Sequence, residues 1–250
     1  MENKVRLRFS KRDGLRFIGH LDFLRVFQQM IRRSGLPIAY SQGFNPHQIV
    51  SFALPLPLGM ESVHDYADIT LTAGVPAGEI VESLNDAAPR GLHVLAAYPV
   101  QGANAAAATV AADYVISLPS CHGACPGPRP GGLDPYALNV GATAPTRASV
   151  GADSISTRDL QSCIAKILQS ETLIIPKKTK SGIKNTDIRP DIFSIEITDA
   201  GLKLRLSAGS ARFLNPLPVA EQILQTTPCT SAISRVELYQ TDGAGAFKPL

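Results

Sequence analysis

Residues 4–9 alternate strictly between apolar and cationic side chains. A period of two residues is typical of a strand that buries one face. The sequence therefore predicts a strand here, with a core side and a cationic side. The apolar members are Val5, Leu7 and Phe9, and the cationic members are Lys4, Arg6 and Arg8.

Between Gly19 and Ser34 the apolar residues recur at the spacing of an amphipathic helix. Asp22 lies in the first turn, where the helix dipole favours a carboxylate, and Gly35 supplies the C-terminal stop. The breakers Gly43 and Pro46 then predict a loop over residues 39–47. The apolar stripe of the helix contains Leu21, Phe23, Leu24, Phe27, Met30 and Ile31.

The order strand, helix, strand, strand, helix, strand occurs twice along the chain. This repeated order predicts an α+β protein with two tandem ferredoxin-like (βαββαβ) domains, each with an antiparallel sheet. We place the domains at residues 1–100 and 109–250, with QGANAAAA (residues 101–108) as the linker. The elements are predicted at residues 4–9, 19–34, 49–56, 66–72, 76–87 and 92–100, and again at 110–118, 156–169, 192–198, 202–207, 216–224 and 233–239, with β character also at 172–176.

Two segments of the second half do not fit this order. Residues 120–152 are rich in Gly, Pro, Ala and Ser, which predicts a flexible insertion. Residues 177–189 are basic and rich in turn-forming residues. They either reach a nucleic-acid backbone or form a solvated hairpin loop.

The bulk composition is that of a globular protein, with 44% apolar and 18% charged residues in a chain of 250. No apolar run is long enough for a membrane span, and the charged N-terminus is unlike a signal peptide. Four cysteines in a chain of this length do not make a disulfide framework. We therefore expect a cytoplasmic protein that does not enter a membrane.

Charge is distributed unevenly. Residues 1–50 hold nine Lys and Arg against three Asp and Glu, a net charge of +6, whereas residues 51–128 hold one against seven, a net charge of −6. A basic N-terminal region suggests a polyanionic partner such as RNA. Clustered arginines on a solvated helix face are the simpler explanation.

The segments RFSKRDGLRFIGHLDFLRVF (8–27), RRSGLPIAYSQGFNPH (32–47) and SFALPLPLGMES (51–62) closely resemble the start of the radical SAM-linked, or radical SAM-associated, protein family of unknown function. Shorter pieces, such as DIRPDIFSIE and LNPLPVAEQIL, are similar further along the chain. The resemblance implies a radical SAM, cobalamin-type protein as partner, but no reaction. The chain departs from the family's NPHPK or NPRPK loop at Gln48 and Ile49, which removes a proline and a lysine.

A radical SAM enzyme holds its iron–sulfur cluster with three cysteines, typically spaced CxxxCxxC. Cys121 and Cys125 match the first two positions, but Pro128 occupies the third. The chain is therefore not expected to be the radical SAM catalyst, and we expect neither a cofactor nor a metal. A metal bound by the cysteines with His122 is the disfavoured alternative.

No complete catalytic motif occurs in the sequence, so the hypothesis that the protein is an enzyme is the less favoured one. An alternative is a metal-independent ribonuclease or RNA-modifying enzyme, in which His20, Asp22 and His47 act on an RNA hydroxyl. His20 beside Asp22 is more simply a capping arrangement at a helix start.

Recognition is the more coherent hypothesis. Tyr40 and Phe44 offer rings for stacking unpaired bases, and Gln42, Asn45 and His47 offer groups for their edges. The alternatives are that the two rings pin the loop to the core, or that the chain is a docking module for the partner protein alone. The side chains assigned to phosphate contacts are Arg6, Arg8, Lys11, Arg12, Arg16 and Arg25.

Overall fold

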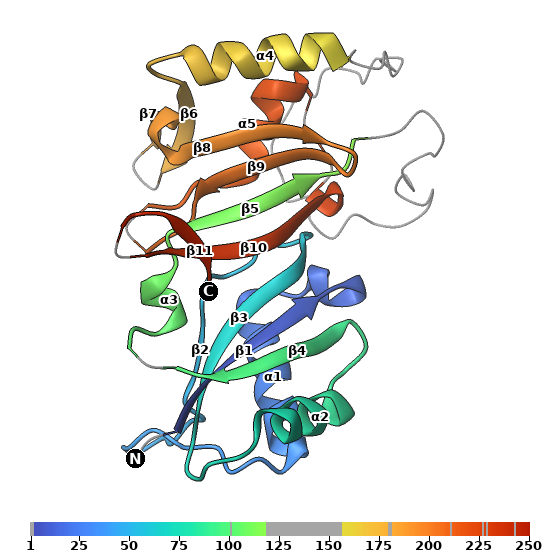
Figure 1. The fold of residues 1–250 in the computed structure, drawn as a ribbon, viewed down its shortest axis with the longest axis vertical. Coiled ribbons are helices and arrows are strands. Elements are labelled where there is room, and N and C mark those ends of the chain that lie inside the picture. Colours follow the sequence, from blue (N-terminus) through green and yellow to red (C-terminus); the bar gives the residue numbers. More distant parts are fainter. Residues whose placement is uncertain are drawn as a thin grey trace.

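A computed structural model describes the chain at residues 3–100, 102–118, 157–179, 182–210, 212–226, 228, 230–242 and 244–250. The fold of these residues is mixed α+β, with one large, mostly antiparallel sheet and few helices (Figure 1). The predicted insertion at residues 120–152 lies outside the described residues.

The first half of the chain follows the predicted order of elements. β1 buries Val5, Leu7 and Phe9 against helices α1 and α2, so the prediction of a strand with one core face is confirmed. Helix α1 buries four of its six predicted apolar residues, while Leu21 is exposed and Leu24 half-buried. The elements are β1 (Asn3–Lys11), α1 (His20–Ser34), β2 (Val50–Phe52), β3 (Glu61–Leu71), α2 (Ala77–Ala87) and β4 (Leu92–Pro99), with a short 3-10 helix at Asp13–Phe17.

The second half repeats the order and adds α3, β11 and a hairpin, and a hairpin is one of the two alternatives given for residues 177–189. A two-stranded ribbon of β6 and β7 occupies most of the predicted basic insertion, and β11 follows β10. The elements are α3 (Ala105–Ala108), β5 (Ala111–Ile116), α4 (Thr157–Gln169), β6 (Ile174–Thr179), β7 (Gly182–Asp187), β8 (Ile192–Thr198), β9 (Gly201–Ser207), α5 (Pro216–Leu224), β10 (Ile233–Thr241) and β11 (Phe247–Pro249), with 3-10 turns at Arg189–Asp191 and Thr230–Ala232.

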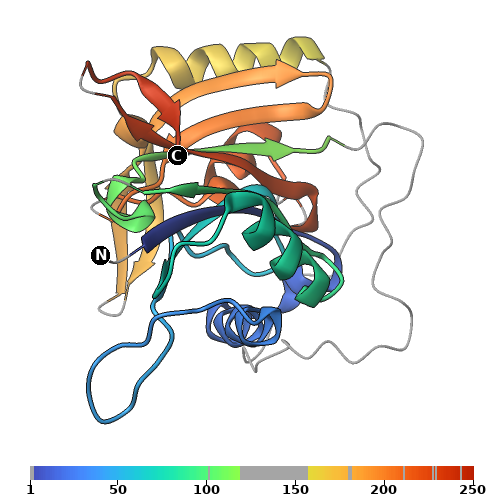
Figure 2. The ribbon, with the colours of Figure 1, turned by 60° about the horizontal axis from the view of Figure 1, so that its bottom comes forward.

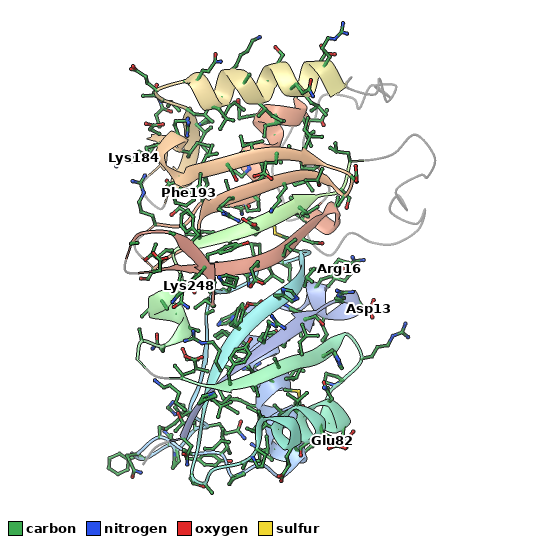
Figure 3. The ribbon with its side chains drawn as sticks, viewed as in Figure 1. Asp13, Arg16, Glu82, Lys184, Phe193 and Lys248 are labelled. Atoms are coloured by element: carbon green, nitrogen blue, oxygen red, sulfur yellow. The ribbon has the colours of Figure 1, made fainter. Side chains whose placement is uncertain are left out.

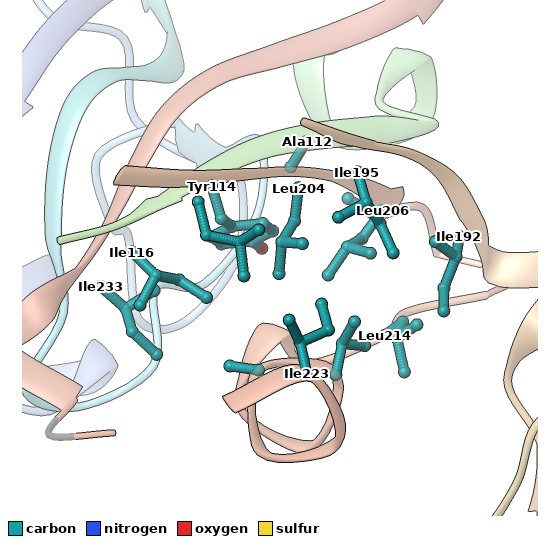
Figure 4. Close-up of a cluster of buried hydrophobic side chains, with 14 of the residues drawn as sticks. Ala112, Tyr114, Ile116, Ile192, Ile195, Leu204, Leu206, Leu214, Ile223 and Ile233 are labelled. Carbon is teal, nitrogen blue, oxygen red and sulfur yellow. The ribbon is translucent and has the colours of Figure 1, made fainter. Parts of the chain in front are cut away.

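The core of the second half lies between its strands and α5 (Figure 4). Tyr114 of β5 and Leu204 of β9 are paired in register and point toward Ile223 of α5. All three are fully buried. Alternate residues on these strands point to the opposite face, as the period of two requires.

The two halves share one sheet, although the sequence suggested two separate sheets. The strand order is β4-β1-β3-β10-β5-β9-β8. β3 and β10 are parallel and pair at Glu61 with Ser234 and at Ser62 with Arg235. β2 pairs with the other end of the same edge of β3. The predicted linker also packs against the sheet, because α3 starts at Ala105, whose buried N–H donates to Asp68.

A buried carboxylate anchors the face of the second half that lies opposite α5. Asp113 of β5 accepts hydrogen bonds from Arg205 at 2.7 and 2.9 Å and from the Tyr239 hydroxyl at 2.9 Å. Burial of Asp113 opposes its ionisation, but the hydrogen bonds from Arg205 and Tyr239 outweigh burial and lower its pKa. The ionised form is therefore part of the folded state.

Because of Asp113, we expect stability to fall in acid. The folded pKa lies below the unfolded value of about 3.9, so the unfolded chain binds this proton more tightly. The Asp113 carboxylate contributes its full share to the free energy of unfolding above the unfolded pKa. This share is lost as the pH falls through the folded pKa. Urea denaturation at several acidic pH values measures this pH dependence of the free energy of unfolding. Asp113→Asn is expected to flatten the pH dependence, and Asp22→Asn, at an exposed carboxylate, to leave it unchanged; an unaltered slope in Asp113→Asn contradicts this assignment.

Candidate nucleic-acid interface

Residues 39–48 form a projecting ribbon, which we call the finger (Figure 2). Its base continues the edge of the sheet, since the Ala39 N–H donates to the Thr70 carbonyl at 2.8 Å and the Ile49 N–H donates to the Ala39 carbonyl at 2.9 Å. Tyr40 and Gln48 pair across the ribbon. The base of the finger thus extends the β-structure, and residues 41–47 form a loop without regular structure, as predicted.

A clasp between Ser41 and His47 closes the tip of the finger. The Ser41 N–H donates to the His47 carbonyl at 2.8 Å, and the His47 N–H donates to the Ser41 hydroxyl at 3.1 Å. The same hydroxyl lies 2.8 Å from Nδ1 of the His47 ring. Gly43 adopts a φ of +133°, which a residue with a side chain rarely adopts. The two ends of the tip are therefore joined by contacts within the finger.

Both aromatic side chains of the finger face water. Phe44 is fully exposed, at 106% of its reference area, and Tyr40 is 45% exposed. Gln42 and Asn45 are also exposed. The rings do not pin the finger to the core, so they are available as stacking surfaces.

Arg6 does not lie on the open surface that the sequence suggested. Its guanidinium contacts the Asp68 carboxylate at 2.8 and 3.2 Å and the carbonyl of Ala103 at 3.2 Å. Arg6 is only 6% exposed. The charge of Arg6 is therefore compensated by Asp68 within the fold. Its guanidinium is not accessible for a hydrogen bond to a phosphate.

Lys11 is also buried, because a β-bulge between Phe9 and Lys11 turns it toward α1. Its ammonium lies 4.5 Å from the centre of the Phe23 ring. Burial lowers the pKa of Lys11, although the nearby Asp65 carboxylate opposes this effect. Arg8 is half-buried, and its Nε has no hydrogen-bond partner among the described residues.

The remaining predicted cations lie nearer to water. Arg12 is exposed, and Arg25 is exposed while it pairs with Asp22 at 2.8 Å on the surface of α1. Arg16 is half-buried and contacts Glu61 at 2.9 Å. Surface pairs of this kind are weak enough to exchange for a phosphate. Of the six predicted phosphate contacts, Arg12 and Arg25 are the most accessible.

His20 and His47 contact different side chains. His20 begins α1, and its ring centre lies 5.6 Å from that of Phe52. His47 belongs to the finger, where its Nδ1 lies 2.8 Å from the Ser41 hydroxyl. Gly19 is the N-cap without a side-chain hydrogen bond, so the capping interpretation of His20 and Asp22 is wrong.

The sequence analysis missed a second cluster of polar side chains at the junction of the halves. Nδ1 of His64 lies 2.9 Å from the Glu237 carboxylate, to which the Tyr66 hydroxyl donates at 2.6 Å. Burial and the Glu237 carboxylate raise the pKa of Tyr66 well above its usual value. The alternation of β3 signals that His64 and Tyr66 share a face. Nothing in the sequence signals that Glu237 meets them.

The described residues contain no group of three or more His, Cys, Asp or Glu side chains that is able to hold a metal ion. The predicted pair Cys121 and Cys125 lies outside these residues. Among the described helices, none is long and apolar enough to cross a membrane.

A family model described as "Uncharacterized protein conserved in bacteria (DUF2344)" matches residues 4–216. The chain belongs to this family. The range matched to DUF2344 includes the finger, α1 and the cluster partners His64 and Tyr66, and it ends before Glu237. A comparison with curated proteins finds no match. The DUF2344 description names neither a reaction nor a partner, so the link to a radical SAM enzyme stays a prediction.

Proposed function

We propose that the protein is an RNA-binding or substrate-presenting accessory protein that works with a radical SAM, cobalamin-type enzyme. The observation that carries the RNA-binding part is the fully exposed ring of Phe44 at the tip of the closed finger. Holding an apolar ring in water costs free energy that a covering ligand would recover. The radical SAM partner is supported by the resemblance of residues 8–62 alone.

Unpaired RNA bases suit the chemistry of the finger. A base has an apolar face that stacks on an aromatic ring and an edge that needs hydrogen bonds. Gln42, Asn45 and His47 are exposed on either side of Phe44 and offer amide and imidazole groups. Because the clasp holds the tip in place, binding would lose little conformational freedom.

Phosphate contacts are expected to be few. Of the six proposed cations, only Arg12 and Arg25 are exposed. Two contacts to a single strand predict a slope of log affinity on log salt of roughly −1.4, at about −0.7 per phosphate. Binding that is independent of salt would argue against a polyanion.

Phe44→Ala is expected to weaken binding of a labelled single-stranded RNA by about 5-fold to 160-fold, since stacking of one base contributes ~1–3 kcal/mol. Fluorescence anisotropy with the full chain at fixed salt measures this change. Because Phe44 packs on nothing, thermal stability should not change.

The matched control is Phe17→Ala, which removes a ring that is 58% exposed outside the finger. We expect this variant to bind RNA as the unchanged protein does. Equal losses in both variants, or no loss in Phe44→Ala, would remove the finger from the proposal.

The partner is tested separately. Co-purification with a radical SAM enzyme that disappears after nuclease treatment supports an RNA-bridged complex. Co-purification that survives nuclease and high salt instead favours a module that docks on the protein partner directly.

A ribonuclease centred on His20 and His47 has less support, because the two rings belong to separate features. Incubation with labelled RNA in chelator tests it. Cleavage that is lost in His20→Ala would favour this alternative over an accessory role.

At the level of fold, we propose that each half is a ferredoxin-like unit. Support comes from the strand orders β4-β1-β3-β2 and β10-β5-β9-β8, which arrange the four strands of each βαββαβ repeat in the same way.

A further inference from the structure

A cleft of about 380 Å³ opens beside the ends of β1, β3 and β4. Its polar lining consists of Ser10, Arg12, Asp13, His64 and His93. Asp13, which is labelled in Figure 3, shows on which side of the molecule the cleft lies. The finger does not line this cleft, and of the cations proposed for RNA only Arg12 does.

Glu237 fixes one imidazole of the cleft. Its carboxylate accepts hydrogen bonds from the Tyr66 hydroxyl at 2.6 Å and from the Leu238 N–H at 3.1 Å, and it lies 2.9 Å from Nδ1 of His64. A carboxylate held on two sides orients the ring that binds to it. Nε2 is then the His64 nitrogen left without a partner among the described residues.

The other polar groups come from neighbouring strands. His93 of β4 pairs in register with Ser10 of β1, and the exposed Arg12 follows at the end of β1. Ser10 is 8% exposed, so its hydroxyl belongs to the wall of the cleft. The one carboxylate of the lining, Asp13, lies 3.9 Å from the Arg90 guanidinium, which partly compensates its charge.

We propose that this cleft binds the phosphate group of a ligand about the size of a mononucleotide. A guanidinium, two imidazoles and a hydroxyl in one cleft offer several donors, and a phosphate accepts several hydrogen bonds at once. The volume lies at the lower end of the range of small-molecule sites, which suits a nucleotide better than a longer chain. Arg12 provides the charge, and Ser10 and His93 provide donors from neighbouring strands. Because the Nδ1–H of His64 is donated to Glu237, Nε2 of His64 donates to the phosphate only when this ring carries both protons.

The test is a titration of the full chain with inorganic phosphate, AMP and adenosine, followed by NMR of the histidine ring C–H groups. We expect phosphate and AMP to shift the His64 and His93 resonances, and His20 to stay unchanged. Adenosine, which lacks the phosphate, is expected to shift neither of the cleft histidines.

Arg12→Ala is expected to weaken AMP binding by about tenfold or more, because it removes a hydrogen bond between two charged groups. Arg12 is exposed, so this variant should fold normally. The matched control is Arg32→Ala, an exposed arginine on α1 that should leave the affinity unchanged.

Three results would overturn the proposal. They are the absence of any shift at millimolar phosphate and AMP, an equal shift with adenosine, and equal losses in Arg12→Ala and Arg32→Ala. Phe44→Ala should bind AMP normally, so failure of the finger as an RNA site and failure of the cleft are distinguishable.

Discussion

Asp65→Ala is expected to destabilise the protein by about 3–5 kcal/mol, which is the effect of breaking a buried ion pair by removing one partner. Arg235 of β10 is fully buried and donates to the Asp65 carboxylate at 2.6 Å. Without this carboxylate, the buried guanidinium has no carboxylate partner among the described residues and keeps its hydrogen bonds to the carbonyls of Leu54 and Pro55, at 2.9 and 3.3 Å. Unfolding by guanidinium chloride measures the change.

Two further variants isolate the cause. Asp22→Ala removes the carboxylate of an exposed pair and should cost less than about 1 kcal/mol. Replacing both partners, Asp65→Ala with Arg235→Met, should recover part of the loss because no uncompensated charge is left. A cost for Asp65→Ala as small as that for Asp22→Ala would show that the buried pair does not join the halves energetically.

Phe9→Ala is expected to cost about 3–5 kcal/mol, the usual cost of deleting a buried Phe ring. Phe9 has no exposed area, and its ring centre lies 5.3 Å from that of Phe27 and 6.0 Å from those of Phe23 and Phe52. Its removal leaves a cavity between β1 and α1 that rigid neighbours fill only partly. Chemical denaturation again gives the free energy of unfolding.

Phe17→Ala removes the same side chain from an exposed position, so its effect should stay within about 0.5 kcal/mol. The difference between the two variants reports burial alone. Equal effects would mean that β1 and α1 do not form the core contact described above.

The hydrophobic pattern identified the buried face of β1 and most of that of α1, because the core determines which positions must be apolar. Val5, Leu7 and Phe9 are buried as predicted. The pattern says nothing about what covers the other face of a strand. Arg6 meets Asp68 from 62 residues further along the chain, so an apparently free cation is an internal ion pair.

The candidate site was predictable only where it depended on local sequence. The breakers Gly43 and Pro46 identified the finger, and its aromatic residues are exposed. The His64 cluster depends on a residue 173 positions away in sequence. No local signal encodes a contact of that separation, and the pairing of β3 with β10 that creates it was not predicted.

The position of β10 has a consequence for biosynthesis. The counter-ion of Asp65 and the acceptor of the Tyr66 hydroxyl lie 170 and 171 residues later in the chain. A nascent N-terminal half on the ribosome therefore carries both groups, and the free edge of β3 at Glu61 and Ser62, before their partners exist. Co-translational folding of that half stops short of the native sheet until β10 has left the ribosome.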